Sequence, residues 1–221
     1  GVDEAIAADM ATHGMNSVTA YDVPVLNGQQ LKSDLPYIVS VARQHGLLAD
    51  GIPVLYLYAK ADDWLADFCP PLPIAGALMA EQKQKQWPEL LFYCVDEPNS
   101  PEAAQKAKDA IRRMKQQYPD CKMVSAIGKG AIDQGLVDYY DVIIVDSMDM
   151  DREIQQTIRS RPDKKWLLYE CRQNGKTPLV DRYGAGFYLF AMGGKGFGQW
   201  VYTDLARQSD QGTQIVYGHV K

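Results

Sequence analysis

The chain has 221 residues, of which 46% are hydrophobic and 10% aromatic, and its formal net charge is -5. This length suits one domain with a sizeable core, so we expect a single domain over residues 1–221. Lys and Arg are scattered along the chain or lie beside acidic residues, which argues against a nucleic-acid partner. No apolar stretch approaches the roughly 20 residues needed for a membrane span. The chain starts at Gly1 without Met, and we therefore expect it to be part of a longer or processed protein.

Helical and strand patterns alternate from the start of the chain. Apolar residues at helical spacing predict a helix over Val2–His13, and β-branched residues predict a strand over Ser17–Tyr21. The other predicted helices are Asp34–His45, Ile74–Trp87, Ser100–Tyr118, Asp151–Arg159 and Leu179–Met192. The other predicted strands are Val54–Tyr58, Leu90–Val95, Lys122–Ile127, Val142–Val145, Lys165–Tyr169 and Gly198–Tyr202.

This alternation predicts an α/β fold with a parallel sheet and helices packed outside it. The turns after Tyr21 and Tyr58 lack the glycine-rich phosphate-binding fingerprint, which argues against a doubly wound dinucleotide fold. A TIM-type (β/α)8 barrel has eight strands, and this chain opens with a helix that has no strand before it. We therefore predict a barrel that lacks its first strand, with a gap or a substitute strand in that place.

The apolar run Leu90–Val95 ends in two adjacent carboxylates, Asp96 and Glu97. Such carboxylates repel each other and resist desolvation, so their position at the end of a strand favours acid/base chemistry over packing. In a barrel this end of the strands forms the active site. Adjacent strand residues face opposite sides, so both can enter one site only if the backbone departs from β geometry near Pro98. The alternative is that Asp96 caps the next helix while Glu97 faces solvent.

The other predicted strands also end in polar or aromatic residues. Aromatic rings stack on sugars, and carboxylates bind hydroxyls or act on glycosidic bonds, so this set predicts a carbohydrate substrate. The residues are Tyr21, Tyr58, Asp146, Tyr169, Glu170 and Trp200. Some of the tyrosines could instead pack in the core. The three histidines show no metal-ligand spacing, and we expect neither a metal nor a cofactor.

Three segments together resemble the catalytic barrel of glycoside hydrolase family 123 and its uncharacterised relatives. They are Asn16-Ser17-Val18-Thr19, Tyr93-Cys94-Val95-Asp96-Glu97-Pro98, and Arg182 followed by Gly196-Phe197-Gly198-Gln199-Trp200. The resemblance implies a retaining β-N-acetylhexosaminidase-like reaction, in which the acetamido oxygen of the substrate attacks the anomeric carbon. Asp96 would orient the acetamido group, and Glu97 would serve as acid and then as base. It also favours a secreted or periplasmic location.

Under this reading the substrate-binding residues are Tyr21, Tyr58, Asp146, Tyr169, Arg182 and Trp200. Two alternatives stay open. One is a clan A-type retaining glycosidase with Glu97 as acid/base and Glu170 as nucleophile. Clan A usually has Asn at the position where this chain has Asp96. Glu170 could equally form a salt bridge with Arg172 or Arg182. The other is a non-catalytic carbohydrate-binding barrel, since the first strand is missing.

The four cysteines lack metal-ligand spacing, and three of them lie in or beside predicted strands. We expect buried thiols rather than disulfides. The oligomeric state is not indicated by any sequence feature.

Overall fold

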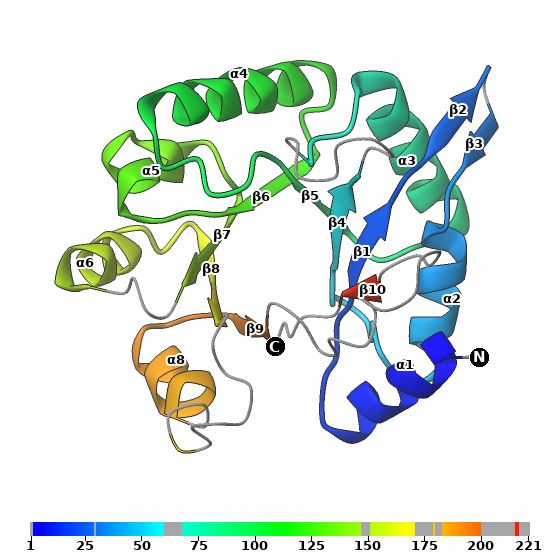
Figure 1. Cartoon of the computed structure of the whole chain (residues 1–221), viewed down its shortest axis with the longest axis horizontal. Coiled ribbons are helices and arrows are strands. Elements are labelled where there is room, and N and C mark those ends of the chain that lie inside the picture. Colours follow the sequence, from blue (N-terminus) through cyan, green and yellow to red (C-terminus); the bar gives the residue numbers. More distant parts are fainter. Residues whose placement is uncertain are drawn as a thin grey trace.

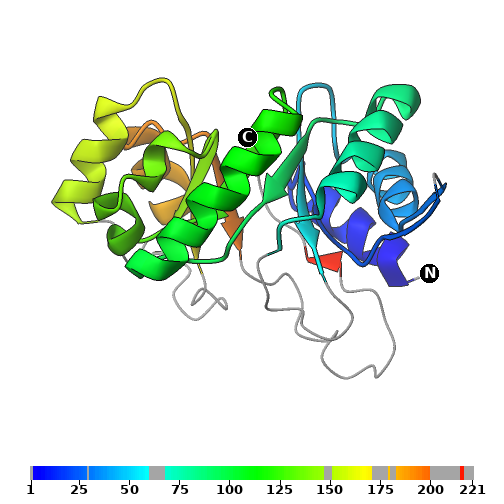
Figure 2. The same ribbon diagram turned by 90° about the horizontal axis from the view of Figure 1, so that it is seen from above.

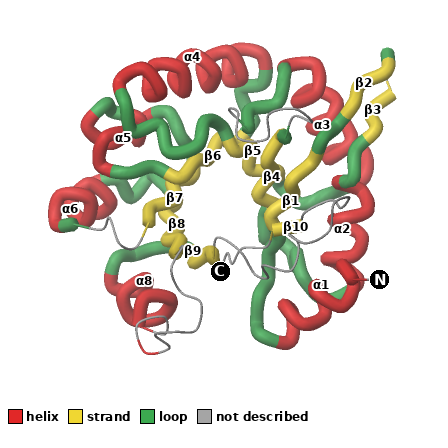
Figure 3. The backbone as a smooth tube through the Cα atoms, viewed as in Figure 1, coloured by secondary structure: helices red, strands yellow, loops and turns green. Residues whose placement is uncertain are grey.

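The computed structural model describes residues 2–28, 30–59, 68–146, 151–170, 179, 183–199 and 215–216. These residues form an α/β fold in which a parallel sheet curls into an arc and helices surround its outer side (Figures 1 and 3). The predicted fold class is confirmed in this coarse form.

Seven parallel strands follow one another across the sheet in chain order. They are β1 (Thr19–Asp22), β4 (Val54–Tyr58), β5 (Leu90–Tyr93), β6 (Lys122–Ala126), β7 (Val142–Asp146), β8 (Lys165–Glu170) and β9 (Gly196–Gln199). A short eighth strand, β10 (Ile215–Val216), pairs antiparallel with β1. Each of the seven predicted strands is found, with shifts of up to two residues at the ends that the structure describes; residues 200–202 of the last predicted strand lie outside the described residues.

The closed barrel that we predicted is not seen in the described part of the chain, where the sheet ends at β9 on one side and at β10 on the other. It is a half-barrel. β10 occupies the free edge of β1, where the first strand of a barrel would lie, and so acts as a substitute strand. Its antiparallel direction and its length of two residues distinguish it from a barrel strand.

Helices cover the outer side of the sheet (Figure 1). They are α1 (Val2–Thr12), α2 (Leu35–Gln44), α3 (Leu72–Lys85), α4 (Pro101–Gln117), α5 (Lys129–Asp133), α6 (Arg152–Ser160) and α8 (Leu189–Ala191). Seen from above, α4 crosses the middle of the molecule between α1–α3 on one side and α6 and α8 on the other (Figure 2). Among the described residues, no helix combines the length and apolarity that crossing a membrane requires.

Some elements differ from the sequence prediction. The predicted helix Leu179–Met192 contains a π-helix, η3 (Gly184–Tyr188), followed by the short α8. The helix α5, the 3-10 helix η1 (Leu136–Asp138) and the hairpin of β2 (Val25–Asn27) and β3 (Gln30–Lys32) were not predicted. An Asn-Gly pair, Asn27-Gly28, lies at the tip of this hairpin and is the sequence signal that could have revealed it.

Two helices begin with side-chain caps at the residues where the sequence predicts each helix to start. The Ser100 side chain accepts a hydrogen bond from the Ala103 N–H, and Pro101 occupies the first helical position of α4. Asp151 caps α6 in the same way by accepting from the Ile154 N–H. These caps satisfy N–H groups that have no partner within the helix, which defines where each helix starts.

Side chains alternate between two hydrophobic clusters because successive strand residues face opposite sides of the sheet. The outer cluster lies between the sheet and the helices and includes Cys94 and Cys121, which are buried thiols as predicted. Cys171 lies outside the described residues. The inner cluster packs on the other face, the concave side of the arc, which we call the hollow and which these side chains occupy. Its buried members are Leu57, Phe68, Leu91, Tyr93, Val124, Ala126, Val142, Ile144 and Leu167, with Tyr21, Leu55 and Tyr169 packed against them.

Candidate active site

The chain leaves regular β geometry directly after β5. Val95 has φ of 58° and Glu97 has φ of 41°, both in the left-handed region that glycine favours. For other residues this conformation costs roughly 1–2 kcal/mol each, and it is least suited to a β-branched residue such as Val95. The backbone therefore departs from β geometry beside Asp96 and Glu97, which is the condition for both side chains to enter one site, and Pro98 at the end of this segment is buried.

Each of the two carboxylates accepts a hydrogen bond from a tyrosine of the inner cluster. The Tyr93 hydroxyl donates to Asp96 Oδ1 at 2.5 Å, and the Tyr169 hydroxyl donates to Glu97 Oε1 at 2.6 Å. Asp96 and Glu97 are both exposed, so a ligand can reach them. The backbone break therefore brings both carboxylates to the carboxyl-end mouth of the hollow. The reading of Asp96 as a helix cap is wrong, because Ser100 caps α4.

The environment of Asp96 disfavours its charged form. Although the residue as a whole is exposed, surrounding protein atoms remove water from its carboxyl group and raise its pKa, and the negative charge of Glu97 raises it further. The hydrogen bond from Tyr93 opposes this shift. Burial raises the pKa of Tyr93 well above its ordinary value, so its phenol stays protonated and donates to Asp96. The same oxygen accepts from the Ala126 N–H at 3.0 Å, which fixes the phenol in place.

Aromatic rings line the hollow below the carboxylates. Tyr21, at the end of β1, is partly buried, and its pKa is raised to about 12 by burial and by the charge of Asp96. Tyr21 contacts Phe68 edge to face at 6.2 Å between ring centroids, and Phe68 contacts Tyr93 in the same way at 5.8 Å. The structure therefore brings Tyr21 and Tyr169 to the two carboxylates. Phe68 was missed because it lies in a loop with no periodic pattern.

Tyr58, which we predicted to bind substrate, lies elsewhere. Leu57 belongs to the inner cluster, so Tyr58, the next residue, packs against the outer cluster. Across the sheet it pairs with Asp22, a buried carboxylate that accepts hydrogen bonds from the Ser33 and Tyr56 hydroxyls. Tyr58 is thus on the opposite face of β4 from the hollow.

The remaining predicted site residues are described only in part. Asp146 and Glu170 end β7 and β8; their backbones pair with Tyr169 and Gln199, and their side chains are outside the described part of the structure. The predicted residues Arg182 and Trp200, and also Arg172, lie outside the described residues.

The Asn99 side chain, which no sequence pattern indicated, stabilises the carboxyl end of the segment that departs from β geometry. Asn99 Oδ1 accepts a hydrogen bond from the Gly128 N–H at 3.0 Å, which ties the segment to the loop after β6. A Cβ on Gly130 would lie 2.2 Å from the Asn99 carbonyl oxygen, so only glycine allows this close approach. Nothing in the spacing of Asn99, Gly128 and Gly130 predicts the contact, because it joins two segments that are far apart in the sequence.

A cavity of about 220 Å³ lies at the opposite end of the sheet. It is lined by Gly51, Ile52, Pro53, Leu91, Val142, Lys165, Leu167 and Lys195, which lie before the strands or in their first residues. It contains no carboxylate, and in barrels this end contributes to stability rather than chemistry. Within the described ranges, no cluster of three or more His, Cys, Asp or Glu side chains is arranged to hold a metal ion.

Comparison with known proteins identifies the family. The sequence model described as "Glycoside hydrolase 123, catalytic domain" matches residues 73–217, well over half of the chain. A family 123 glycoside hydrolase from Clostridium perfringens, whose structure was analysed for glycolipid glycan hydrolysis, has the same fold with a TM-score of 0.61 and 14% sequence identity. The similarity covers 89% of this chain and 43% of that one, so the chain spans less than half of that protein's length. No curated protein matches the sequence. On the match over residues 73–217, the chain belongs to the glycoside hydrolase 123 catalytic domain family.

Proposed function

We propose that this chain is the catalytic part of a retaining glycoside hydrolase that acts on 2-acetamido sugars. The proposal rests on the family and on one observation: two adjacent carboxylates, Asp96 and Glu97, each accept a hydrogen bond from a tyrosine of the inner cluster. These two hydrogen bonds support the proposal that both carboxylates act on one substrate. The β-N-acetylhexosaminidase-like reaction implied by the sequence resemblance needs such a pair.

In the proposed first step, the carbonyl oxygen of the substrate's acetamido group bonds to the anomeric carbon as the glycosidic bond breaks. Glu97 donates its proton to the leaving oxygen, and a cyclic oxazolinium ion forms. The Asp96 carboxylate accepts a hydrogen bond from the acetamido N–H and stabilises the positive charge that develops on the group. The Tyr93 hydroxyl keeps the Asp96 carboxylate oriented for this role.

In the second step, water attacks the anomeric carbon and opens the oxazolinium ring. Glu97, now deprotonated, removes a proton from this water, which returns Glu97 to its acid form. Two inversions at the same carbon give net retention of configuration. The exposure of Glu97 suits this role, because the leaving group and then water must reach it.

The test compares aryl N-acetyl-β-galactosaminide and N-acetyl-β-glucosaminide with aryl β-galactoside and β-glucoside. We expect turnover only where the acetamido group is present, and a loss of at least about 100-fold in kcat for Glu97→Gln and Asp96→Asn. Asp120→Asn, which alters an exposed carboxylate elsewhere on the chain, is the control for the change in net charge.

Two outcomes would contradict the proposal. Turnover confined to sugars without an acetamido group, abolished by Glu170→Gln, would favour the two-carboxylate alternative with Glu170 as nucleophile. Glycan binding without turnover, unaffected by Glu97→Gln, would favour the non-catalytic carbohydrate-binding barrel. The secreted or periplasmic location stays a prediction.

A further inference from the structure

The turn that carries Asp96 and Glu97 adopts a backbone conformation that its own residues disfavour. Val95 and Glu97 both have positive φ, and neither is glycine. Such conformations persist only where the surrounding structure holds them. Groups outside the segment must therefore stabilise the turn.

Two buried hydroxyl groups donate hydrogen bonds to the carbonyl groups of Cys94 and Val95, at the start of this turn. The Tyr140 hydroxyl donates to the Cys94 carbonyl oxygen at 2.6 Å, and the Ser125 hydroxyl donates to the Val95 carbonyl oxygen at 2.5 Å. Ser125 Oγ also lies 3.1 Å from the Ala126 carbonyl oxygen. Both side chains are fully buried, with an exposed fraction of 0%. Their positions are therefore set by packing, and the two hydroxyls act as fixed points for the peptide planes around Val95.

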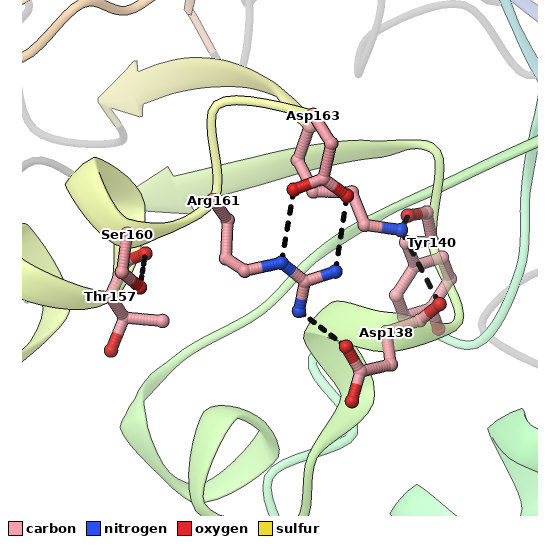
Figure 4. A network of polar contacts seen from close by, with 7 residues as sticks. Asp138, Tyr140, Thr157, Ser160, Arg161 and Asp163 are labelled. Carbon is pink, nitrogen blue, oxygen red and sulfur yellow. Dashed lines mark hydrogen bonds and ion pairs between the residues drawn. The ribbon is translucent and has the colours of Figure 1, made fainter.

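Tyr140 reaches the turn from the segment just before β7, and the strand register places the first residue of β7, Val142, level with Tyr93 at the end of β5. The Tyr140 carbonyl oxygen accepts a hydrogen bond from Lys164 Nζ at 2.9 Å. The same region holds an ion-pair network in which Arg161 contacts Asp138 and Asp163 (Figure 4). The ring is buried in the outer cluster, and its hydroxyl contacts the Cys94 carbonyl oxygen. Its backbone is thus anchored independently of the turn that its hydroxyl contacts.

The phenol of Tyr140 is a permanent donor. Burial raises the pKa of Tyr140 far above its ordinary value, so the hydroxyl keeps its proton throughout the physiological pH range. A neutral phenol with one acceptor at 2.6 Å leaves little freedom to the Cys94 peptide plane.

We propose that Ser125 and Tyr140 are positioning residues for the Asp96–Glu97 pair: their hydroxyls hold the Cys94 and Val95 carbonyls, and so keep the turn in the conformation that places both carboxylates at the mouth of the hollow. Neither residue touches the substrate. The inference rests on the proposed function, and it adds to the machinery one residue of β6, Ser125, and one residue that precedes β7, Tyr140. Loss of either hydroxyl should misplace the carboxylates while leaving the rest of the fold intact.

The test uses Tyr140→Phe and Ser125→Ala, which remove one hydroxyl each and keep most of the side-chain volume. Tyr118→Phe is the matched control, because the Tyr118 hydroxyl also donates to a backbone carbonyl, that of Leu72, at 2.9 Å and away from the turn. For each of the three variants, kcat and KM are measured on the aryl N-acetyl-β-hexosaminides together with the melting temperature. Hydrogen exchange is followed in a peptide that covers residues 94–99.

We expect kcat to fall about 10- to 100-fold in Tyr140→Phe and Ser125→Ala, since a small misplacement of catalytic groups costs that much. KM should change less than about threefold, and exchange in residues 94–99 should become faster. Tyr118→Phe should lower the melting temperature without changing kcat or exchange at the turn. A merely structural role would lower the melting temperature in all three variants alike, with kcat unchanged, and this result would overturn the proposal.

If the proposed function is wrong, the kinetic and exchange measurements give a different set of results. A wild-type chain that turns over neither aryl N-acetyl-β-hexosaminide would reject the function itself. The exchange experiment then still decides on the positioning role: unchanged protection of residues 94–99 in both variants would reject it without reference to any substrate.

Discussion

Tyr169, on β8, forms a hydrogen bond with Glu97, the candidate acid/base. Its hydroxyl donates to Glu97 Oε1 at 2.6 Å, across 72 residues of sequence. A hydrogen bond to a charged group contributes about 1.5–3 kcal/mol, and this bond orients the carboxylate that must transfer a proton. Tyr169 is therefore the side chain that we expect to affect Glu97 most directly.

We predict that Tyr169→Phe lowers kcat/KM by roughly 10- to 100-fold, because the loss of such a bond corresponds to that factor. Steady-state kinetics on an aryl N-acetyl-β-hexosaminide will measure it. Tyr37→Phe is the control, since the Tyr37 hydroxyl donates to the Asp3 carboxylate at 3.3 Å on the protein surface. Equal activity of both variants would show that Tyr169 does not act on Glu97.

The raised pKa of Asp96 makes a prediction about stability. Between the unfolded pKa near 3.8 and the higher folded pKa, the folded state binds more protons than the unfolded state, so stability falls as pH rises through this interval. Above it, the ionised carboxylate destabilises the fold. Asp96→Asn should therefore raise the melting temperature at pH 7 and lose this advantage at pH 3, while activity falls. Thermal unfolding at both pH values, with Asp120→Asn alongside, will show whether the gain exists; a gain of equal size at both would contradict the argument.

At the scale of elements, the residues that end helices and strands decide local stability. The helix α3 ends at Lys85, and Gln86 follows in the left-handed conformation with φ of 51°. Glycine is preferred at this position because it has no Cβ to clash. The Gln86 side chain is exposed, so little is lost if it is removed.

Gln86→Gly should stabilise the protein by roughly 0.5–1 kcal/mol, since it relieves the left-handed strain. Gln84→Gly, inside the last turn of the same helix, should destabilise it by about 0.8–1 kcal/mol. Urea unfolding gives both values. If the two variants changed stability in the same direction, the conformation at Gln86 would not be the cause.

The close contact between Gly130, at the start of α5, and Asn99 supports the active-site turn at its carboxyl end. An added Cβ would lie 2.2 Å from the Asn99 carbonyl oxygen, which is backbone and cannot swing away. Gly130→Ala should destabilise the protein by about 1–3 kcal/mol and lower kcat, because the loop that holds Asn99 must move. Gly186→Ala, where an added Cβ meets nothing within 4 Å, is the control. The prediction fails if both variants retain wild-type unfolding midpoints and rates.

At the scale of the whole molecule, the half-barrel has a centre and two edges. β5, β6 and β7 have strand neighbours on both sides, whereas β9 ends the described sheet and β10 is only two residues long. Amide protons of β5–β7 should therefore exchange with solvent most slowly, and those of β9 and β10 fastest. Hydrogen exchange followed by NMR will test this order. Equal protection at the centre and at β9 would indicate an additional strand on that edge.

Much of the architecture was predictable because the signals are local. Both ends of the strand Val54–Tyr58 were predicted at the correct residues. The predicted start of the helix at Ser100, followed by Pro101, matches the start of α4. The Asp96–Glu97 pair stood out because two carboxylates rarely follow a buried strand without a reason. The hairpin at Asn27-Gly28 was missed although its signal was present.

The amino-acid sequence alone determined the seven strands, most of the helices between them and the pair of carboxylates at the end of β5, since each depends on periodicity or on neighbouring residues. Only the tertiary structure decided that the sheet stays a half-barrel, that Tyr58 faces the helices, and that Tyr93 and Tyr169 bind Asp96 and Glu97. These features depend on contacts between residues far apart in the chain. The left-handed turn at Val95 and Glu97 is the clearest case, because its own residues disfavour this conformation, and the hydroxyls of Ser125 and Tyr140, far away in the sequence, donate hydrogen bonds to its carbonyl groups.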